Sequence, residues 1–441
     1  MLHFDQTIFA LSSGSLPSGV AVLRLSGRKA LEACEMLTGA LPAPRIATVR
    51  TIRSRNNLHL DRGLVVVFPA PASFTGEDCV EFHLHGGRAV VAAVLEELGQ
   101  LPGLRAAEAG EFSRRAFENG KIDLVEAEGL GDLIAAQTEM QRRLAVEHSF
   151  GALSTLYNSW SERLLEARAL IEAELDFVDE DDVPGSVSAR IWSDMRLLSD
   201  DMAAHLRAAK TGELIRDGLK VALVGAPNAG KSSLMNRLVD RDVAIVSEIA
   251  GTTRDVIHAE IDIGGFVVKL YDTAGLRDAS ETIEREGIRR ALAAAVQADI
   301  VLYLEDLSNP IEVKLPSDMQ GRIVRVANKD DLAARDLTGR YDLYISAQTG
   351  SGIDELKDLL IAELKAQSLI SSMRLPSRLR QKGFITRAHL YLQDALNGVK
   401  NPLEIRAEEL RLAGEQLGHV TGQHNTEDLL AVIFSAFCIG K

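Results

Sequence analysis

The sequence predicts a multidomain α+β protein with an N-terminal α/β domain, a helical domain, and a P-loop α/β domain inserted into the helical one. Three observations predict this fold class: short β-rich runs near the N-terminus, a long middle region with helical spacing of apolar residues, and a later region where strand and helix patterns alternate. A chain of 441 residues also exceeds what one hydrophobic core usually holds.

The N-terminal domain is predicted from residues 1–118. Val20–Leu25 and Gly63–Phe68 are β-rich runs bounded by Gly and Pro, which is typical of strands. From Asp123 to Lys210, Leu, Ala and Ile recur every three or four residues among charged ones, which predicts long helices. The helical domain therefore begins at about residue 119.

The inserted domain is predicted from residues 215–370, where alternating strand and helix patterns indicate a parallel sheet. Helical character returns over 371–441, for example in Glu404–Gly414. Helices on both sides of an α/β unit indicate a domain insertion, so 119–214 and 371–441 form two parts of one helical domain. We expect these flanking helices to bury their apolar faces against each other.

Composition favours an ordinary globular protein of the cytoplasm. The formal net charge of −14 argues against a broad nucleic-acid footprint on this chain alone. Cys34, Cys79 and Cys438 lie far apart, which fits neither a disulfide framework nor a zinc site and favours a reducing compartment. We expect no signal peptide, and the apolar run Leu429–Ile439 is much shorter than the ~20 residues of a membrane helix.

The segment Gly225–Ser232 matches the phosphate-binding pattern G-x-x-x-x-G-K-[ST]. It follows the apolar run Val221–Val224 and precedes the helical pattern Ser233–Leu238, which is the context this motif requires. Its glycines allow backbone N–H groups to surround phosphate oxygens at a helix N-terminus. Lys231 is expected to reach the β- and γ-phosphates and the Ser232 hydroxyl to ligate Mg²⁺.

Four further motifs follow in the order expected of a GTP-binding domain. Gly251–Asp255 contains Thr253, which can complete the Mg²⁺ shell, and the apolar run Phe266–Tyr271 leads into Asp272–Gly275. The run Ile323–Ala327 delivers Asn328–Asp331, where Asp331 can accept the ring N–H and exocyclic amine of guanine, which adenine does not offer. Tyr344–Ala347 would support the base through the Ala347 N–H. The sequence therefore predicts GTP binding.

The residue that orients the attacking water is less evident. Many small GTPases have a Gln directly after the Asp-x-x-Gly motif, but this chain has Leu276 there. Glu284 is the candidate for this role. Glu281 and Glu286 are alternatives, and a solvated helix acid is the plain structural interpretation.

Several segments together resemble the MnmE (TrmE) family of tRNA-modification GTPases. The similarity covers the whole chain and includes Gly225–Ser232, Gly251–Asp255, and the terminal Phe437-Cys-Ile-Gly-Lys441. In the N-terminal third, Phe74–Gly87 and Gly110–Leu124 are similar to that family's folate domain.

This resemblance implies functions that spacing does not show. It implies a homodimer formed through the N-terminal domain, which binds 5-formyl- or 5,10-methylene-tetrahydrofolate. It also implies a flavoprotein partner, MnmG (GidA), which supplies FAD within a heterotetramer or larger complex and contacts tRNA mainly as part of it. The product is an aminomethyl-type group at C5 of the wobble uridine.

The resemblance also implies residue roles. K⁺ would stimulate hydrolysis and be held by Asn228, Ser247, Ile249 and Thr252, and Mg²⁺ by Ser232 and Thr253. Glu284 takes the place of the catalytic acid, and Cys438 is a candidate for the modification chemistry. The folate-contacting residues are Arg24, Glu81, Lys121 and Lys441. Motifs and resemblance together predict that GTP is bound by Asn228, Ala229, Gly230, Lys231, Ser232, Ser233, Ser247, Thr252, Thr253, Asp272, Thr273, Ala274, Gly275, Asn328, Lys329, Asp331, Ser346 and Ala347.

Some features allow more than one interpretation. The family's Pro-Pro-Gly-Arg-Gly-Gly loop is replaced by Ser12–Gly19, without Arg, which alters the expected rim of the folate pocket. Glu81, His83 and His85 share one face of a predicted strand, which could form a metal site. Turn geometry or a polar ligand pocket is favoured over a metal, and the resemblance favours the pocket. Cys438 is either catalytic or a buried packing residue.

Two rival functions remain at this point. A GTP-switched RNA or ribosome assembly factor would need a basic RNA-binding module, and the sequence has neither a basic tract nor such a module. A folate-binding regulator with an inactive GTPase domain is disfavoured by the intact Lys231, Ser232, Thr253, Asp272 and Asp331.

Overall fold

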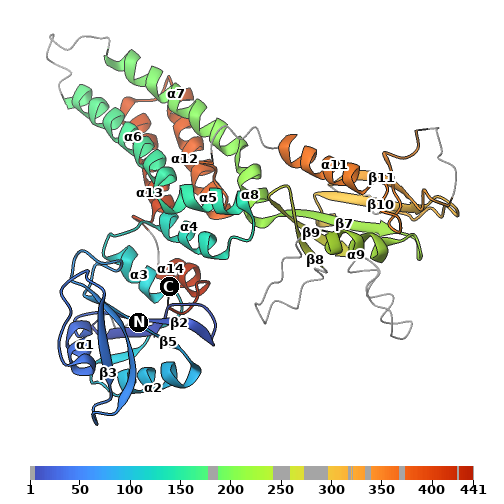
Figure 1. Cartoon of the computed structure of the whole chain (residues 1–441). Coiled ribbons are helices and arrows are strands. Elements are labelled where there is room, and N and C mark those ends of the chain that lie inside the picture. The colour runs from blue at the N-terminus through green and yellow to red at the C-terminus, as the bar shows by residue number, and fades with distance from the viewer. Residues whose placement is uncertain are drawn as a thin grey trace. The chain divides into compact units, whose positions relative to one another are not determined.

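The computed structural model describes residues 5–176, 187–241, 259–272, 296–315, 319, 321–332, 339–366, 373–424 and 427–440 (Figure 1). The chain divides into two compact units, one formed by residues 1–131 with 417–441 and the other by 132–416. Within the described residues, no helix combines the length and apolar character needed to cross a membrane.

The first unit is built on a mixed sheet with the strand order β3-β4-β5-β2-β1-β6. Neighbouring strands run antiparallel, except that β1 and β6 are parallel. The strands are β1 (Thr7–Leu11), β2 (Ser18–Ser26), β3 (Thr48–Arg53), β4 (His59–Phe68), β5 (Cys79–Gly86) and β6 (Leu104–Ala106). The strand predictions for Val20–Leu25 and Gly63–Phe68 are confirmed, as parts of β2 and β4.

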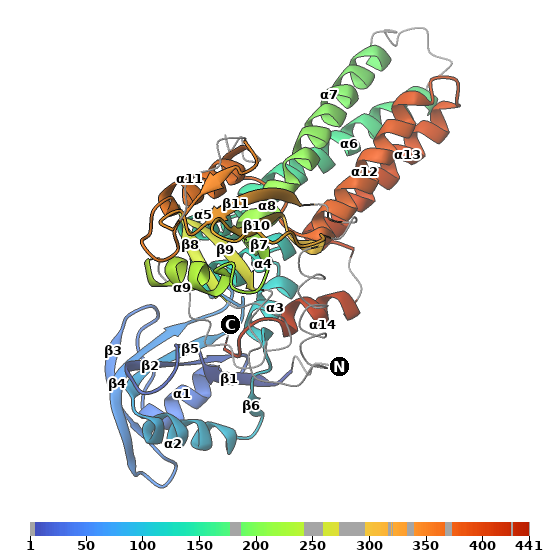
Figure 2. The same ribbon diagram turned by 90° about the vertical axis from the view of Figure 1, so that its right-hand side faces the viewer.

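Helices α1 (Ala30–Thr38) and α2 (Arg88–Gly99) cover one face of this sheet (Figure 2). Leu23 and Leu25 point into this helix-covered core, so the residue between them on β2 faces the opposite side of the sheet. On that other side, Phe112 from α3 (Glu111–Glu118) packs against Ile8 and Ala10 of β1. Arg24 of β2 lies on this second face.

The C-terminal residues complete the first unit. Helix α14 (Glu427–Ser435) packs Leu430 and Phe434 against α4 (Leu124–Ala135) through Leu124 and Ala127. Beyond α14, the Gly110 N–H donates to the Cys438 carbonyl at 3.4 Å, and Ser12 Oγ donates to the Gly440 carbonyl at 2.9 Å. The tail thus pairs with segments that lie far from it in the sequence.

The second unit contains a sheet with the order β12-β11-β10-β7-β9-β8. Strand β8 is antiparallel to β9, and the other described pairings are parallel, as the alternating strand and helix pattern predicts. The strands are β7 (Leu219–Gly225), β8 (Ala259–Ile263), β9 (Phe266–Asp272), β10 (Ile300–Asp306), β11 (Arg322–Asn328) and β12 (Leu343–Tyr344). Helices α9 (Lys231–Arg241) and α11 (Ile353–Ala366) bury apolar residues against one face.

Most of the rest of the second unit is helical (Figures 1 and 2). They are α5 (Glu139–Ser149), α6 (Ala152–Asp176), α7 (Val187–Arg207), α8 (Ala209–Asp217), α12 (Leu379–Asn397) and α13 (Leu403–Thr421). Ser199 of α7 lies 3.0 Å from the ring of His389 on α12, and the Arg406 guanidinium of α13 lies 3.3 Å from the Trp192 ring centroid on α7. These contacts confirm that helices before and after the α/β region pack together.

Candidate nucleotide-binding site

Three of the motifs predicted to bind GTP lie within the described residues, and they meet at one edge of the parallel sheet. Strand β7 lies between β9 and β10, so the chain connections diverge to opposite sides at its carboxyl end. Such a topological switch point is where parallel sheets of this type bind ligands. In the register, Asp272 is level with Leu223 near the end of β7, and Asn328 is level with Asp306 at the end of β10.

The loop after β7 has the backbone geometry of a phosphate-binding turn. Asn228 and Gly230 have positive φ angles of 65° and 93°, and α9 begins directly afterwards at Lys231. Lys231 is 5% exposed, and its Nζ donates to the carbonyls of Gly225 at 2.8 Å and Ala226 at 2.9 Å. The ammonium group is thus held inside the loop at a helix N-terminus, where an anion is favoured. Ser232 and Ser233 are exposed on the first turn of α9.

Asn328 joins this loop to the segment after β12. Its Nδ2 donates to the Ala229 carbonyl at 2.8 Å, and its Oδ1 accepts from the Ala347 N–H at 3.1 Å. The residue is 1% exposed, so both hydrogen bonds form away from water, where an unsatisfied amide is costly. Asn328 therefore fixes the phosphate-binding loop relative to the segment predicted to support the base.

Lys329 is fixed by Asp306, an acid that lies outside the predicted motifs. Its φ is 65°, and its Nζ donates to Asp306 Oδ2 at 2.5 Å. Burial raises the pKa of Asp306, but hydrogen bonds from Lys329 and Ser308 outweigh it, so the net pKa lies below the ordinary value. Asp306 is therefore charged at neutral pH and orients Lys329. Asp331, two residues further on, is exposed at the same edge.

The segment Ser346–Ala347 is shaped by its own hydrogen bonds. Ser346 Oγ accepts from the Thr349 N–H at 3.1 Å, and the Ser346 N–H donates to the Ser351 carbonyl at 2.9 Å. Arg237 of α9 donates from Nε to the Ala347 carbonyl at 3.0 Å. The structure therefore gathers Asn228–Ser233, Asn328–Asp331 and Ser346–Ala347 at one place, as the sequence predicts.

Several predicted site residues lie outside the described residues. They are Ser247, Ile249, Thr252, Thr253, Thr273, Ala274, Gly275, Glu284 and Lys441. Asp272 ends β9, and its side chain is likewise outside the description.

A second polar cluster surrounds Arg24 in the first unit. Arg24 is level with Glu81 on the neighbouring strand, and its Nε and Nη2 donate to Glu81 Oε1 at 3.0 and 2.9 Å. Its guanidinium lies 5.6 Å from the Phe74 ring centroid and 5.9 Å from that of Phe112. Lys121 donates to the Pro71 carbonyl at 3.0 Å, at the base of the loop that carries Phe74.

The two histidines near Glu81 have different partners. His83 Nε2 lies 3.3 Å from Glu81 Oε2, whereas the His85 ring pairs with Asp61 at 2.8 Å. Burial raises the pKa of Asp61, but its hydrogen bonds with His85 and a backbone N–H outweigh this and lower it overall. Within the described residues, no group of three His, Cys, Asp or Glu is arranged to hold a metal ion.

The three cysteines differ in accessibility. Cys34 and Cys79 are buried and Cys438 is exposed. Burial raises the pKa of the Cys34 thiol to about 11, which keeps it protonated and unreactive. Cys438 lies beyond the end of α14, so the interpretation as a buried packing residue is wrong.

Sequence reasoning did not identify four residues that shape these two sites. Asp306 lies at the end of the strand that begins with the apolar run Ile300–Leu304, and the same strand-end rule that identified Asp272 would have found it. Phe74 and Glu77 lie in a segment recognised by resemblance, but their contacts depend on the tertiary fold. The pairing of Arg115 with Glu77 has no local signal, since the two residues are distant in the sequence.

Comparison with known proteins finds similarity over the whole chain. Residues 7–121 match the family model described as GTP-binding protein TrmE N-terminus, and residues 124–438 match the MnmE helical domain. The chain is 56% identical over 443 residues to the tRNA modification GTPase MnmE of Rhizobium etli, with 100% of both chains covered. It is 54% identical to the protein of the same name from Agrobacterium fabrum and 51% to that from Brucella ovis, each covering 99% of both chains. This chain therefore belongs to the MnmE family of tRNA modification GTPases.

Proposed function

We propose that this chain binds and hydrolyses GTP and that hydrolysis serves the modification of tRNA. One observation carries the nucleotide assignment: Asn328 bonds to both the Ala229 carbonyl and the Ala347 N–H, at 2.8 and 3.1 Å. A single buried side chain thereby couples the phosphate-binding loop to the segment beside the base. A nucleotide bound at this edge of the sheet would contact both the phosphate-binding loop and the segment Ser346–Ala347, which Asn328 joins.

Guanine selectivity rests on Asp331. Its carboxylate accepts the ring N–H and exocyclic amine of guanine, and adenine cannot satisfy both acceptors. Asp331 is exposed at the sheet edge and therefore accessible to a base. Lys329, two residues before Asp331, is held through Nζ by Asp306 at 2.5 Å.

The loop also fits a triphosphate and its cation. A Cβ at Gly225 would lie 2.2 Å from the Leu304 carbonyl, so only glycine permits this close turn. Lys231 would neutralise phosphate charge, and Ser232 with Thr253 would hold Mg²⁺, which would supply further positive charge to the phosphates. Asn228, Ser247, Ile249 and Thr252 would hold K⁺, and Glu284 would orient the attacking water.

The first unit is proposed to bind a reduced folate, 5-formyl- or 5,10-methylene-tetrahydrofolate. Arg24 and Glu81 have side chains 23% and 19% exposed, so they are accessible yet held by each other. Glu81 offers a carboxylate to the N–H groups of a pterin ring, and Arg24, Lys121 and Lys441 offer positive charge to the anionic tail. Phe74, 37% exposed beside Arg24, offers an aromatic surface to a planar ring.

The wider proposal follows from family membership. The chain acts in the cytoplasm as a homodimer with the FAD-carrying flavoprotein MnmG (GidA), in a heterotetramer or larger complex, and contacts tRNA mainly within that complex. The outcome is an aminomethyl-type group at C5 of the wobble uridine. The exposed Cys438 is accessible for a role in this chemistry.

The domain division remains part of the proposal. Residues 1–118 form the folate-binding and dimerisation domain, and 215–370 form the GTPase domain. The ranges 119–214 and 371–441 form the two parts of one helical domain, which contacts between α7 and α12 support.

An Asp331→Asn variant tests the nucleotide assignment. An amide donates where the carboxylate accepts, so the variant should lose GTP affinity and gain affinity for xanthosine triphosphate, each by at least about tenfold. Asp354→Asn, at an exposed acid of α11 in the same domain, is the matched control and should leave both affinities unchanged. Unchanged GTP preference in Asp331→Asn would contradict the assignment.

The tRNA role has a separate test. Mass spectrometry of tRNA nucleosides compares a strain lacking the gene with the same strain after its restoration. C5-aminomethyl-type wobble uridines should vanish and return with the gene. Unchanged wobble nucleosides would remove the tRNA role, leave the GTPase assignment intact, and favour the assembly-factor alternative.

A further inference from the structure

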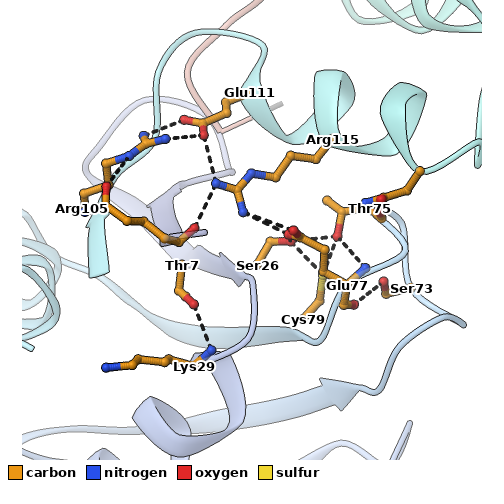
Figure 3. Close-up of polar contacts among 12 residues, drawn as sticks. Thr7, Ser26, Lys29, Ser73, Thr75, Glu77, Cys79, Arg105, Glu111 and Arg115 are labelled. Atoms are coloured by element: carbon orange, nitrogen blue, oxygen red, sulfur yellow. Dashed lines mark hydrogen bonds and ion pairs between the residues drawn. The ribbon is translucent and has the colours of Figure 1, made fainter. Parts of the chain in front are cut away.

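A chain of charged side chains crosses the interior of the first unit (Figure 3). Arg105 of β6 donates from both terminal nitrogens to Glu111, at 2.7 and 2.6 Å. Arg115, one turn along α3, donates to Glu111 at 3.0 Å and to Glu77 Oε2 at 3.0 Å. The side chains of Glu111 and Arg115 are each 1% exposed, so most of this chain is shielded from water.

These buried charges are not explained by stability alone. Burying an ion pair costs about as much in desolvation as it gains, and apolar residues of similar volume often stabilise a fold equally well. Burial raises the pKa of Glu111, but hydrogen bonds from Arg105, Glu108 and Arg115 outweigh it and keep the carboxylate charged. An ion pair, unlike a contact between apolar residues, also holds each of its two side chains in a fixed orientation.

At the end opposite Arg105, the network fixes the segment Ser73–Glu77. Glu77 Oε2 accepts from Ser26 Oγ at 2.7 Å, and Ser26 Oγ lies 2.7 Å from Thr75 Oγ1 (Figure 3). The Thr75 carbonyl accepts from Asn119 Nδ2 at 2.7 Å, which joins the segment to the end of α3. Ser73 Oγ donates to the Glu77 carbonyl at 2.5 Å, so residues on both sides of Phe74 are held.

The two elements joined by the ion pair each carry an aromatic ring that contacts Arg24. Phe74 directly precedes Thr75, and Phe112 directly follows Glu111. Their ring centroids lie 5.6 and 5.9 Å from the Arg24 guanidinium, within the range of cation–π attraction. Phe112 is fully buried, so its ring is fixed, while Phe74 is 37% exposed and depends on its segment for position.

We propose that Glu77 and Arg115 form a positioning pair that holds the Phe74 segment against α3, so that Phe74 and Arg24 together present a preformed surface to a planar, anionic ligand. The pair lies beneath this surface and does not touch the ligand. The inference rests on the proposed binding of a reduced folate at Arg24 and extends it to residues outside the pocket.

The test is calorimetric titration of the full chain with 5-formyltetrahydrofolate. Glu77→Gln keeps the shape of the side chain but removes the charge that pairs with Arg115. We expect at least a tenfold weaker affinity, with GTP turnover unchanged. Arg114→Gln is the matched control: it lies on the same helix and is 7% exposed, but it pairs with Glu118 and Glu427 instead of the Phe74 segment. It should lower the melting temperature without weakening folate binding.

A double-mutant cycle identifies the route of the effect. If Glu77 acts through Phe74, then Glu77→Gln should weaken binding much less in a Phe74→Leu background than in the wild type. Fully additive losses would overturn this route. Should Glu77→Gln not fold, Ser26→Ala removes one hydrogen bond to the Glu77 carboxylate and the contact with Thr75, but keeps the ion pair, and should weaken binding by a smaller factor in the same direction.

The outcomes separate this inference from the folate proposal. Wild-type protein that binds no 5-formyltetrahydrofolate would overturn both. Wild-type binding together with unchanged affinity in Glu77→Gln would overturn the positioning pair and leave folate binding in place.

Discussion

Gly230 and Asn328 approach so closely that a Cβ atom at Gly230 would lie 2.1 Å from Asn328 Nδ2. That amide nitrogen is the donor to Ala229, so the side chain cannot retreat without breaking the bridge across the nucleotide site. The phosphate-binding loop and the guanine-binding motif therefore constrain each other's residue types.

Replacing Gly230 with Ala should weaken GTP binding severely. The substitution introduces a clash and places a side chain at φ 93°, which together cost about 2–4 kcal/mol, or roughly 30- to 1000-fold in affinity. Titration with a fluorescent GTP analogue measures the loss. Gly383→Ala in α12 is the control, because nothing lies within 4 Å of its added Cβ, and it should bind GTP normally. GTP affinity within threefold of wild type in Gly230→Ala would contradict the packing described.

GTP turnover should be at least about tenfold faster in KCl than in NaCl at equal ionic strength. Asn228 lies at the exposed turn of the phosphate-binding loop with φ 65°, and it is proposed to hold a cation beside the phosphates. K⁺ is larger and more weakly hydrated than Na⁺, so replacing its water by amide and carbonyl oxygens costs less free energy. Steady-state phosphate release measures the effect, and Asn228→Ala should abolish the difference. Equal rates in the two salts would remove K⁺ from the mechanism.

Glu284→Ala should lower GTP hydrolysis by at least 100-fold with GTP affinity within about threefold of wild type. Leu276 has no polar group to orient water, so the chain needs another residue for this role. Single-turnover hydrolysis and equilibrium binding measure the two effects separately. Glu281→Ala and Glu286→Ala are the comparison variants. If one of them is inactive while Glu284→Ala remains active, the water-orienting role belongs to that residue instead.

Acidification should destabilise the helical region through His205. Burial, with a smaller contribution from His148, lowers the pKa of His205 to about 4, and its Nε2 lies 3.0 Å from Tyr157 Oη. Between pH 6.5 and 4 the unfolded chain binds a proton that the folded chain does not, so stability decreases as the pH falls. The expected loss between pH 7 and pH 5 is about 2 kcal/mol.

Melting temperatures at the two pH values check this prediction. His205→Gln keeps a hydrogen-bonding group for Tyr157 but does not titrate, so its melting temperature should depend less on pH than that of the wild type. His59→Gln, at an exposed histidine, should behave like the wild type. An identical pH response in wild type and His205→Gln would exclude His205 as the cause.

The fold class and the nucleotide site could be predicted because their signals are local. Gly225–Ser232 encodes its turn in consecutive residues, and the runs 266–271 and 323–327 show their strands directly. Helices α1 and α2 were not predicted individually, since they are short and lie among strands. Their apolar residues are covered only once the sheet has formed.

The second site depends on contacts between distant residues, which no local pattern records. Arg115 meets Glu77 only because α3 packs beside the Phe74 segment, and Arg24 meets Phe112 for the same reason. The resemblance identified Arg24 and Glu81, but it gave no indication of the ion pairs beneath them. Asp306 was missed for a simpler reason, because its strand was not predicted.

The division of the first unit between residues 1–131 and 417–441 has a consequence for biosynthesis. Its last elements leave the ribosome only after Asp132–Gln416 has been translated, roughly 15–60 s later at ~5–20 residues per second. During that interval the faces of α3 and α4 that pack against α14 are uncovered on the nascent chain. A chain that ends before α14 would keep this apolar surface exposed. Chaperones and proteases bind such surfaces, so we expect these shortened chains to be degraded.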